Sequence, residues 1–132
     1  MSSLTSGIKN VALGMQCLAT VSTGGDNVGV GQGALADLSG NAGNTAVGSQ
    51  ALETTSGDES VAVGYTALVT ASTGQYNIAI GSRTGSTVRT GSKNILIGYS
   101  ADAPGILAFQ ASHSSAFPTL TYSTGFRAKL RF

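Results

Sequence analysis

The chain has few of the residues on which most catalytic and metal-binding sites depend. Among its 132 residues there is one cysteine, Cys17, one histidine, His113, and no tryptophan, and only 10% of the residues are charged. A single cysteine excludes an intrachain disulfide and cannot form a structural metal site by itself. A catalytic nucleophile paired with histidine would have to use His113, and no nucleophile motif lies near it. The sequence therefore predicts a protein without enzymatic activity, catalytic residues, cofactor or metal.

Long hydrophobic segments are also missing. No stretch approaches the length of a membrane helix, and the first residues lack the basic and apolar regions of a cleavable signal. We expect a soluble protein with no signal peptide and no membrane insertion. Glycine and small or β-branched residues are abundant instead, with 19 Gly and 41% hydrophobic residues in total. This composition differs from that of disordered chains and suits tightly stacked strands with glycine at the corners.

A short pattern of the form Asn-x-Ala-Val-Gly recurs six times. Its first residue, called the lead residue here, falls at positions 10, 27, 44, 60, 77 and 94, with steps of 17, 17, 16, 17 and 17 residues. The lead residues are Asn10, Asn27, Asn44, Ser60, Asn77 and Asn94. A fixed period of this length indicates one small unit stacked on copies of itself. The predicted fold is therefore all-β, a parallel β-roll (β-solenoid) of six repeats of about 17 residues.

The three residues after each lead residue alternate in size, which predicts a strand. The first and third are large and mostly β-branched, as in Ile78 and Ile80, with Thr45 as the exception. The second is Ala or Gly in every copy except the sixth, which has Leu96. We expect the large side chains to face the interior of the coil. The small ones are then expected to form a smooth strip that faces a neighbouring chain.

Glycines mark two expected corners in each repeat. One follows every strand, at Gly14, Gly31, Gly48, Gly64, Gly81 and Gly98. The other lies three residues before each lead residue, where the third copy has Asn41 instead of glycine. Because asparagine is the most frequent non-glycine residue with positive φ, we predict a positive φ at Asn41. The lead asparagines should stack in a column in which side-chain amides bond successive turns.

An Ala-Leu pair follows the strand in three copies, and Cys17-Leu18 is its first version. We therefore interpret Cys17 as a small buried residue in the place of alanine; a reactive thiol is the alternative. In the fifth copy Thr84-Gly85 replaces the pair. This drift indicates the approach of the end of the solenoid, where repeats are atypical.

Residues 102–132 do not continue the repeat. We divide the chain into a repeat domain, 1–101, and a C-terminal capping and attachment segment, 102–132, because an uncapped terminal coil would expose strand edges. The last seven residues alternate apolar with basic side chains, which predicts a strand with one charged face. Its basic residues Arg127, Lys129 and Arg131 form the candidate attachment surface. A terminal strand that ends in phenylalanine is also found in outer-membrane barrel proteins. Against this alternative, the sequence does not predict the other strands of a barrel.

Charge is distributed unevenly along the chain. Residues 1–76 contain one basic and five acidic residues, a net charge of −4, whereas residues 77–132 contain six basic residues and one acidic, a net charge of +5. Because sequence position corresponds to height in a stacked repeat, we expect one acidic and one basic end. The basic end is then suited to docking on an acidic partner. An incidental distribution of solvated charges is the alternative.

The repeat motif resembles the head repeats of trimeric autotransporter adhesins, which read Asn/Ser-x-Val-Ala-Ile-Gly-x-x-Ala. It is also similar to the longer Asn-x-Ala-Val-Gly-x-x-Ala-Leu repeats of bacteriophage tail fibres and other virion surface proteins. The resemblance covers about residues 7–101 and implies a parallel β-roll in a homotrimer. The longer period, and the expected absence of a signal, stalk and membrane anchor, favour a virion component over a bacterial adhesin.

The resemblance implies a non-enzymatic virion structural protein, a bacteriophage capsid decoration, cement or fibre component that forms a stable trimer on the particle surface. Its expected partners are its own copies and other virion proteins. The alternative is a receptor-binding adhesin or tail-fibre tip that binds a host glycan or surface protein. A tip should present exposed aromatic side chains, and the repeats offer only Tyr65, Tyr76 and Tyr99.

Overall fold

The computed structural model describes residues 7–20, 23–38, 40–55, 57–70 and 73–102. In these ranges the chain is an all-β parallel solenoid, with strands and turns but no helix. Six strands form the main sheet: β1 (Val11–Leu13), β2 (Val28–Val30), β4 (Thr45–Val47), β6 (Val61–Val63), β7 (Ile78–Ile80) and β8 (Ile95–Ile97). A second sheet pairs β3 (Asp37–Leu38) with β5 (Thr54–Thr55). The predicted cap lies outside the described residues, apart from Asp102.

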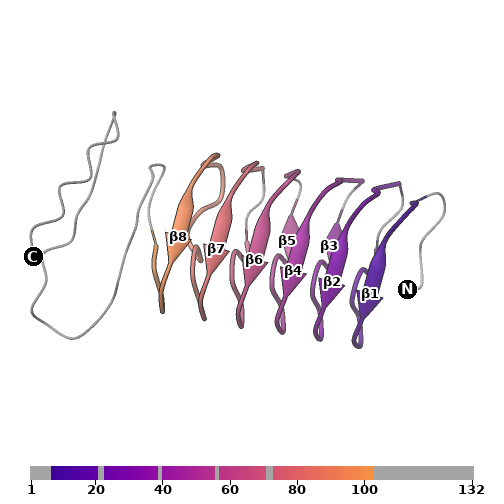
Figure 1. Ribbon diagram of the computed structural model, residues 1–132, viewed down its shortest axis with the longest axis horizontal. Helices are drawn as coiled ribbons and strands as arrows, with labels where there is room; N and C mark the ends of the chain where they lie inside the picture. Colours follow the sequence, from indigo (N-terminus) through magenta and orange to yellow (C-terminus); the bar gives the residue numbers. More distant parts are fainter. Residues whose placement is uncertain (1–6, 21–22, 39, 56, 71–72, 103–132) are drawn as a thin grey trace, which may run out of the picture.

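The repeat period is confirmed by the register of the main sheet. Each strand pairs in parallel with the equivalent strand of the next coil, so that Val28 lies opposite Thr45 and Ile78 opposite Ile95. The single 16-residue step falls between β4 and β6, where Thr45 still pairs with Val61. Figure 1 shows the result, a row of coils stacked along the long axis from β1 to β8.

Each strand of the main sheet is three residues long and is followed directly by a glycine. A glycine follows the strand with φ between 133° and 137°, a conformation that L side chains rarely adopt. A Cβ atom at Gly48 would also collide with the backbone carbonyl of Gly64 in the next coil. The predicted corner after the strand is therefore confirmed, and both the dihedral angle and the close stacking of coils require glycine there.

The side chains of the strands point in the opposite directions to those predicted. The middle residue of each strand points into the coil, and Ala46, Ala62 and Ala79 have no exposed surface. The flanking large residues point outward, as Ile78 and Ile80 do, with 38% and 41% of their surface exposed. The interior is filled from the segment after the strand by a column of buried leucines, namely Leu18, Leu35, Leu52 and Leu68. Because these leucines occupy the core, only a small side chain fits from the strand.

The prediction for Asn41 is also wrong, since its φ is not positive. The equivalent glycines lack positive φ as well; they are glycine because a backbone carbonyl of the next coil approaches, as Asn41 O approaches Gly24. Positive φ occurs instead one residue before each lead residue, at Lys9, Asp26, Gly43, Glu59, Tyr76 and Lys93. The alignment of repeats is unaffected, because the strand register supports it independently.

Within the described ranges there is no helix with the length and hydrophobicity that crossing a membrane requires.

Candidate functional site

The most extensive apolar feature on the described surface is the outer face of the main sheet. Two columns of side chains run along it from β1 to β8, one from the first and one from the third position of each strand. We call these twelve residues the outer stripe: Val11, Leu13, Val28, Val30, Thr45, Val47, Val61, Val63, Ile78, Ile80, Ile95 and Ile97. All twelve are partly or fully exposed. Such continuous apolar surfaces mark interaction sites in soluble proteins.

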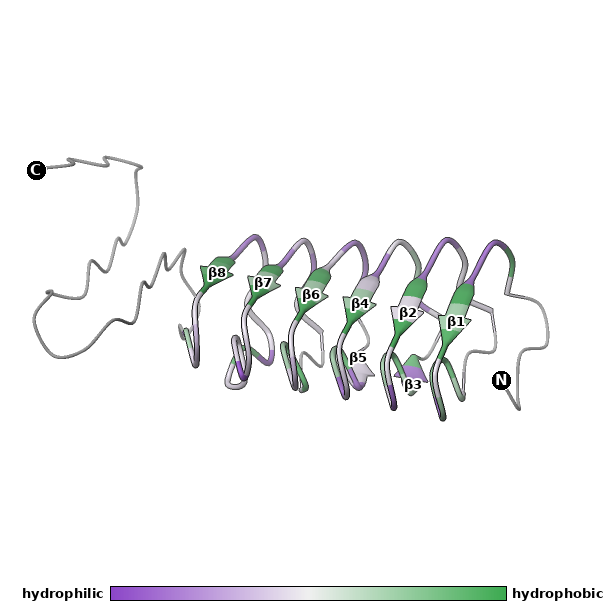
Figure 2. Cartoon of the chain, turned by 60° about the horizontal axis from the view of Figure 1, so that its bottom comes forward, coloured by the Kyte–Doolittle hydropathy of each residue, from purple (hydrophilic) through white to green (hydrophobic). Residues whose placement is uncertain are grey.

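Polar corners border the outer stripe. Figure 2 shows the strands of the main sheet mostly in the green of hydrophobic residues, with paler parts in β2 and β4, and purple, hydrophilic residues in the segments between strands. The last residue of each segment, directly before the lead residue, has a positive φ; Asp26, Glu59 and Lys93 are among these residues and are exposed. No charged residue lies within the stripe itself. An apolar centre with a polar rim is the usual composition of a protein–protein interface.

A ladder of buried polar side chains runs behind one edge of the sheet, as the sequence predicts for the lead residues. The Asn27 backbone N–H donates to Asn10 Oδ1 at 3.0 Å, Asn44 N–H donates to Asn27 Oδ1 at 2.9 Å, and Asn94 N–H donates to Asn77 Oδ1 at 3.0 Å. Ser60 continues the ladder, because its hydroxyl accepts from Asn77 N–H at 3.2 Å. The predicted bonding of successive turns is therefore confirmed.

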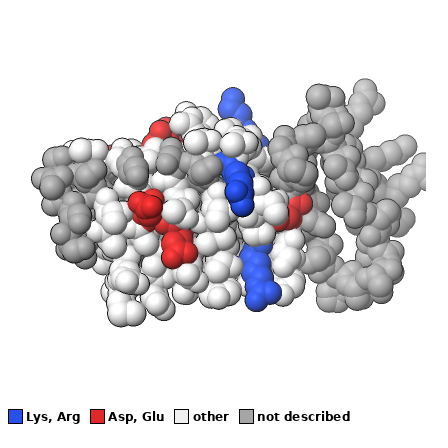
Figure 3. Space-filling model, turned by 180° about the vertical axis from the view of Figure 1, so that it is seen from behind, with Lys and Arg blue, Asp and Glu red and all other residues white. Residues whose placement is uncertain are grey.

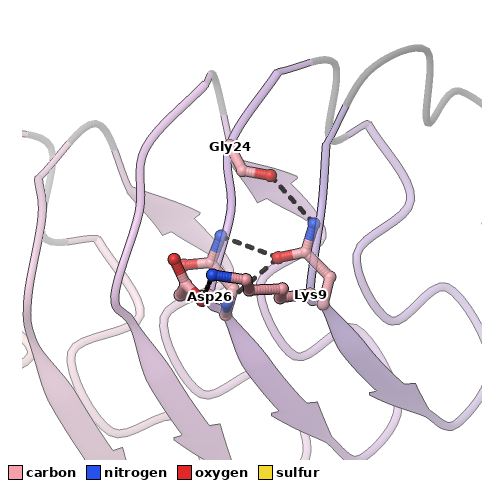
Figure 4. A network of polar contacts seen from close by, with 5 residues as sticks. Lys9, Gly24 and Asp26 are labelled. Atoms are coloured by element: carbon pink, nitrogen blue, oxygen red, sulfur yellow. Dashed lines mark hydrogen bonds and ion pairs between the residues drawn. The ribbon is translucent and has the colours of Figure 1, made fainter.

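The amide nitrogens of the ladder bond the next coil. Asn10 Nδ2 donates to the carbonyl oxygen of Gly24 at 2.8 Å and Asn27 Nδ2 to that of Asn41 at 2.9 Å. Figure 4 shows the first rung, with the exposed pair Lys9–Asp26 beside it at 3.8 Å. Because its polar groups are occupied within the protein, the ladder holds the coils together and does not present a binding site.

Two open depressions line other faces of the solenoid. One, of about 510 Å³, is bordered by Gln16, Ala19, Thr20, Ala36, Asp37, Glu53 and Thr54. The other, of about 420 Å³, is bordered by Asp26, Ala42, Gly43, Asp58, Glu59 and Tyr76. In the second, Asp58 Oδ1 accepts hydrogen bonds from Ala42 N–H and from Asn41 Nδ2, so this carboxylate is engaged in holding two coils together. Among the described residues no group of histidine, cysteine and acidic side chains is arranged to hold a metal ion.

Cys17 is buried, as predicted, with 1% of its surface exposed. It occupies the column position that Ala34, Ala51 and Ala67 occupy in later coils. Burial raises the pKa of the Cys17 thiol, which disfavours the reactive thiolate. Its environment is therefore that of a core residue.

Within the described residues, charged side chains of one sign cluster along the solenoid axis, apart from Lys9 at the start and Asp102 at the end. Acidic residues of coils two to four, such as Glu53 and Glu59, are followed by the basic residues Arg83, Arg89 and Lys93 of coils five and six. Figure 3 shows from behind the red side chains followed by blue ones along the solenoid, with a further red group past the blue. In the chain, Asp102 is the acidic residue that follows the basic group. The candidate attachment residues Arg127, Lys129 and Arg131, like His113, lie outside the described residues.

The sequence interpretation missed the outer stripe because both faces of each strand carry apolar residues. The signal that could have revealed it is the Ala-Leu or Cys-Leu pair that follows the strand in the first four coils. A leucine in each of these coils and an alanine or glycine in the middle of each of their strands are complementary in volume, whereas two β-branched columns and a leucine column together exceed what one narrow coil can enclose.

These features define the class of the chain, a parallel β-solenoid repeat protein. In comparisons with protein-family models, with curated proteins and with solved structures, none matched the chain.

Proposed function

We propose that the chain is a non-enzymatic structural protein of a virion, and that it assembles as a homotrimer through the outer stripe. The observation that supports self-association is the stripe itself, in which eleven of the twelve residues are aliphatic, one is threonine and none is charged. The Ala and Gly strip that the sequence suggested as the interface is buried inside each coil. In this proposal the large residues of the outer stripe, and not the small ones, form the interface with a neighbouring chain.

The periodicity of the stripe favours another copy of the chain as its partner. Its rungs repeat at the strand spacing of about 4.8 Å. A sheet of the same chain has the same spacing, so its side chains can fit between these rungs along the full height of the solenoid. Covering the stripe removes apolar surface from water, which contributes about 25 cal/mol per Å². The trimeric state and the virion role rest on the resemblance of the repeat motif.

Self-association is tested by placing charge in the stripe. Val63→Glu and Ile80→Glu should each convert the assembly to a folded monomer, because an unpaired carboxylate would be buried at the interface. Val69→Glu is the matched control, since its column position already holds Glu53 one coil earlier. Light scattering measures the mass, and circular dichroism checks that the strands remain. A native chain that is a folded monomer at micromolar concentration would contradict the proposal.

The basic C-terminal residues are proposed to attach the trimer to an acidic surface of the particle. Replacing Arg127, Lys129 and Arg131 together by Gln should leave the trimer folded and reduce the amount of protein that co-purifies with particles. The alternative is a receptor-binding tip, for which the exposed aromatic side chains of the repeats are Tyr65, Tyr76 and Tyr99. In that case the triple variant would still be incorporated, and binding to host cells would fall instead.

A further inference from the structure

Thr45 is the only polar residue among the twelve of the outer stripe. It lies at the first position of β4, in the third of six coils, between Val28 and Val61 of the neighbouring strands. Threonine and valine have nearly the same shape, so Thr45 differs from its neighbours chiefly in replacing one methyl group by a hydroxyl. Its position therefore adds a single hydrogen-bonding group near the middle of an aliphatic surface.

The hydroxyl of Thr45 makes no hydrogen bond within the described part of the chain. Some other threonines of the solenoid do use theirs; Thr54 Oγ1 donates to the carbonyl of Val69 at 3.1 Å and Thr70 Oγ1 to that of Ser86 at 3.0 Å. The backbone N–H of Thr45, in contrast, donates to the carbonyl of Ser60 at 2.9 Å and fixes the strand without involving the side chain. The Thr45 hydroxyl is thus left for whatever covers the stripe.

Aliphatic rungs by themselves specify the arrangement of two copies poorly. If copies pack in parallel, each coil meets the same coil of its neighbour. If they pack antiparallel, which twofold symmetry allows in a dimer but threefold symmetry does not allow in a trimer, coil two meets coil five and coil three meets coil four, and all six rungs are still covered. Because the other rungs are all Val, Ile or Leu, the two arrangements bury similar apolar side chains. Burial of apolar surface is non-directional and does not distinguish them.

The Thr45 hydroxyl removes this ambiguity. In the parallel, in-register arrangement the Thr45 side chains of neighbouring copies meet, and each hydroxyl can donate to one neighbour and accept from another. In the antiparallel arrangement Thr45 meets Val61 and Val63, and the hydroxyl is buried without a partner. An unpaired buried hydroxyl carries its full desolvation cost, whereas a paired one does not.

We propose that Thr45 determines the direction and register in which copies associate through the outer stripe. This inference rests on the proposed self-association and adds the residue that makes it specific. A single polar residue in an aliphatic interface has the same effect in coiled coils, where it selects one register at some cost in stability.

The test uses disulfide cross-linking between reporter positions away from Thr45. In a Cys17→Ala background, one chain carries Val30→Cys in coil two and a second, mass-tagged chain carries Ile80→Cys in coil five. Parallel packing links each variant to itself, and antiparallel packing links the two variants to each other. Mass spectrometry of the mixed, oxidised sample gives the ratio of the two products.

With Thr45 present, like-to-like links should exceed mixed links about tenfold, the ratio expected for one unpaired hydroxyl. Thr45→Val should bring the ratio close to one, and Thr45→Ser, which retains the hydroxyl, should preserve the excess. Valine at this position has native counterparts in Val28 and Val61, so the fold should tolerate it. An unchanged ratio in Thr45→Val overturns the assignment while leaving the proposed assembly intact. A native chain that light scattering shows to be a monomer overturns the assembly and this inference with it.

Discussion

Asn44 is fully buried, and both ends of its side-chain amide are hydrogen-bonded. Its Oδ1 accepts from Ser60 N–H at 3.0 Å, and its Nδ2 donates to the carbonyl of Gly57 at 3.1 Å. These bonds satisfy backbone groups of the next coil that would otherwise be buried without partners. At the scale of one residue, the ladder therefore stabilises the stack because each amide completes the hydrogen bonding of its neighbour.

Removing one rung of the ladder should destabilise the protein. Asn44→Ala leaves Ser60 N–H and the Gly57 carbonyl without their partner, and we expect a loss of about 2–4 kcal/mol in the free energy of unfolding. Asn44→Ser should lose roughly half as much, because the native Ser60 hydroxyl already accepts a backbone hydrogen bond in this column. Urea denaturation at one protein concentration measures both. Equal losses for Ala and Ser would show that the hydrogen bond to Ser60 contributes little.

At the scale of one coil, the interior keeps an almost constant volume. Where the leucine column is interrupted by Gly85, the strand of the next coil carries Leu96 in place of alanine. A Cβ atom at Gly85 would lie 2.6 Å from Leu68 Cδ2 and 3.2 Å from Leu96 Cδ1, so Leu96 uses the space that glycine leaves. Gly29 stands in the same relation to Cys17, whose Sγ would lie 2.5 Å from a Cβ atom added at Gly29.

This exchange of volume predicts a compensating double mutant. Leu96→Ala should cost about 2–5 kcal/mol through the cavity that it leaves. Gly85→Leu alone should destabilise by overpacking, by about 1–3 kcal/mol. The double variant restores the pattern of the other coils, where Leu52 and Leu68 adopt a similar positive φ of 48°. We expect the double variant to lose at least ~1 kcal/mol less free energy of unfolding than the sum of the two single losses. A double-mutant cycle followed by thermal or urea denaturation measures this difference. Additive effects would mean that the two residues do not share one space.

At the scale of the whole molecule, the described chain is close to one-dimensional. Each coil contacts the next through the same strand pairs and the same ladder, and the first four coils also share the leucine column. Stability should then be approximately a sum over coils and the contacts between them. The fold therefore depends on the period being kept more than on the number of coils.

Deletion of one whole coil tests this conclusion. Removing residues 61–77 joins Ser60 to Ile78, which keeps every column in phase, and we expect a shorter solenoid with a lower unfolding midpoint and weaker self-association. Removing residues 61–68 joins Ser60 to Val69, which breaks the phase, and this control should lose its strand signal. Circular dichroism and light scattering measure both properties. If the in-phase deletion unfolds the chain as completely as the control does, the coils are not equivalent units.

Much of the fold could be predicted from the sequence, because the lead residues and the glycines recur at fixed spacing. The strands, the parallel register, the asparagine ladder and the burial of Cys17 follow from that spacing and from residue type. The φ of Asn41 could not be predicted from the sequence. Glycine is favoured at the equivalent positions because the backbone of the next coil approaches closely, and not because the local chain needs a positive φ. The outer stripe was missed for a similar reason, since it depends on what else occupies the coil.

The sequence by itself determined the period, the strand positions and the polar ladder, since these need only local alternation and a repeat that places like residues one above another. Only the tertiary structure decided which face of each strand is inside. Alternation with a period of two defines two faces of a strand but does not indicate which of them is buried, and here both faces are apolar. Packing across the coil decides which face is buried, because the leucines leave room for alanine but not for isoleucine. That choice places the large side chains of the strands on the outer surface, where they form the stripe proposed to hold the assembly together.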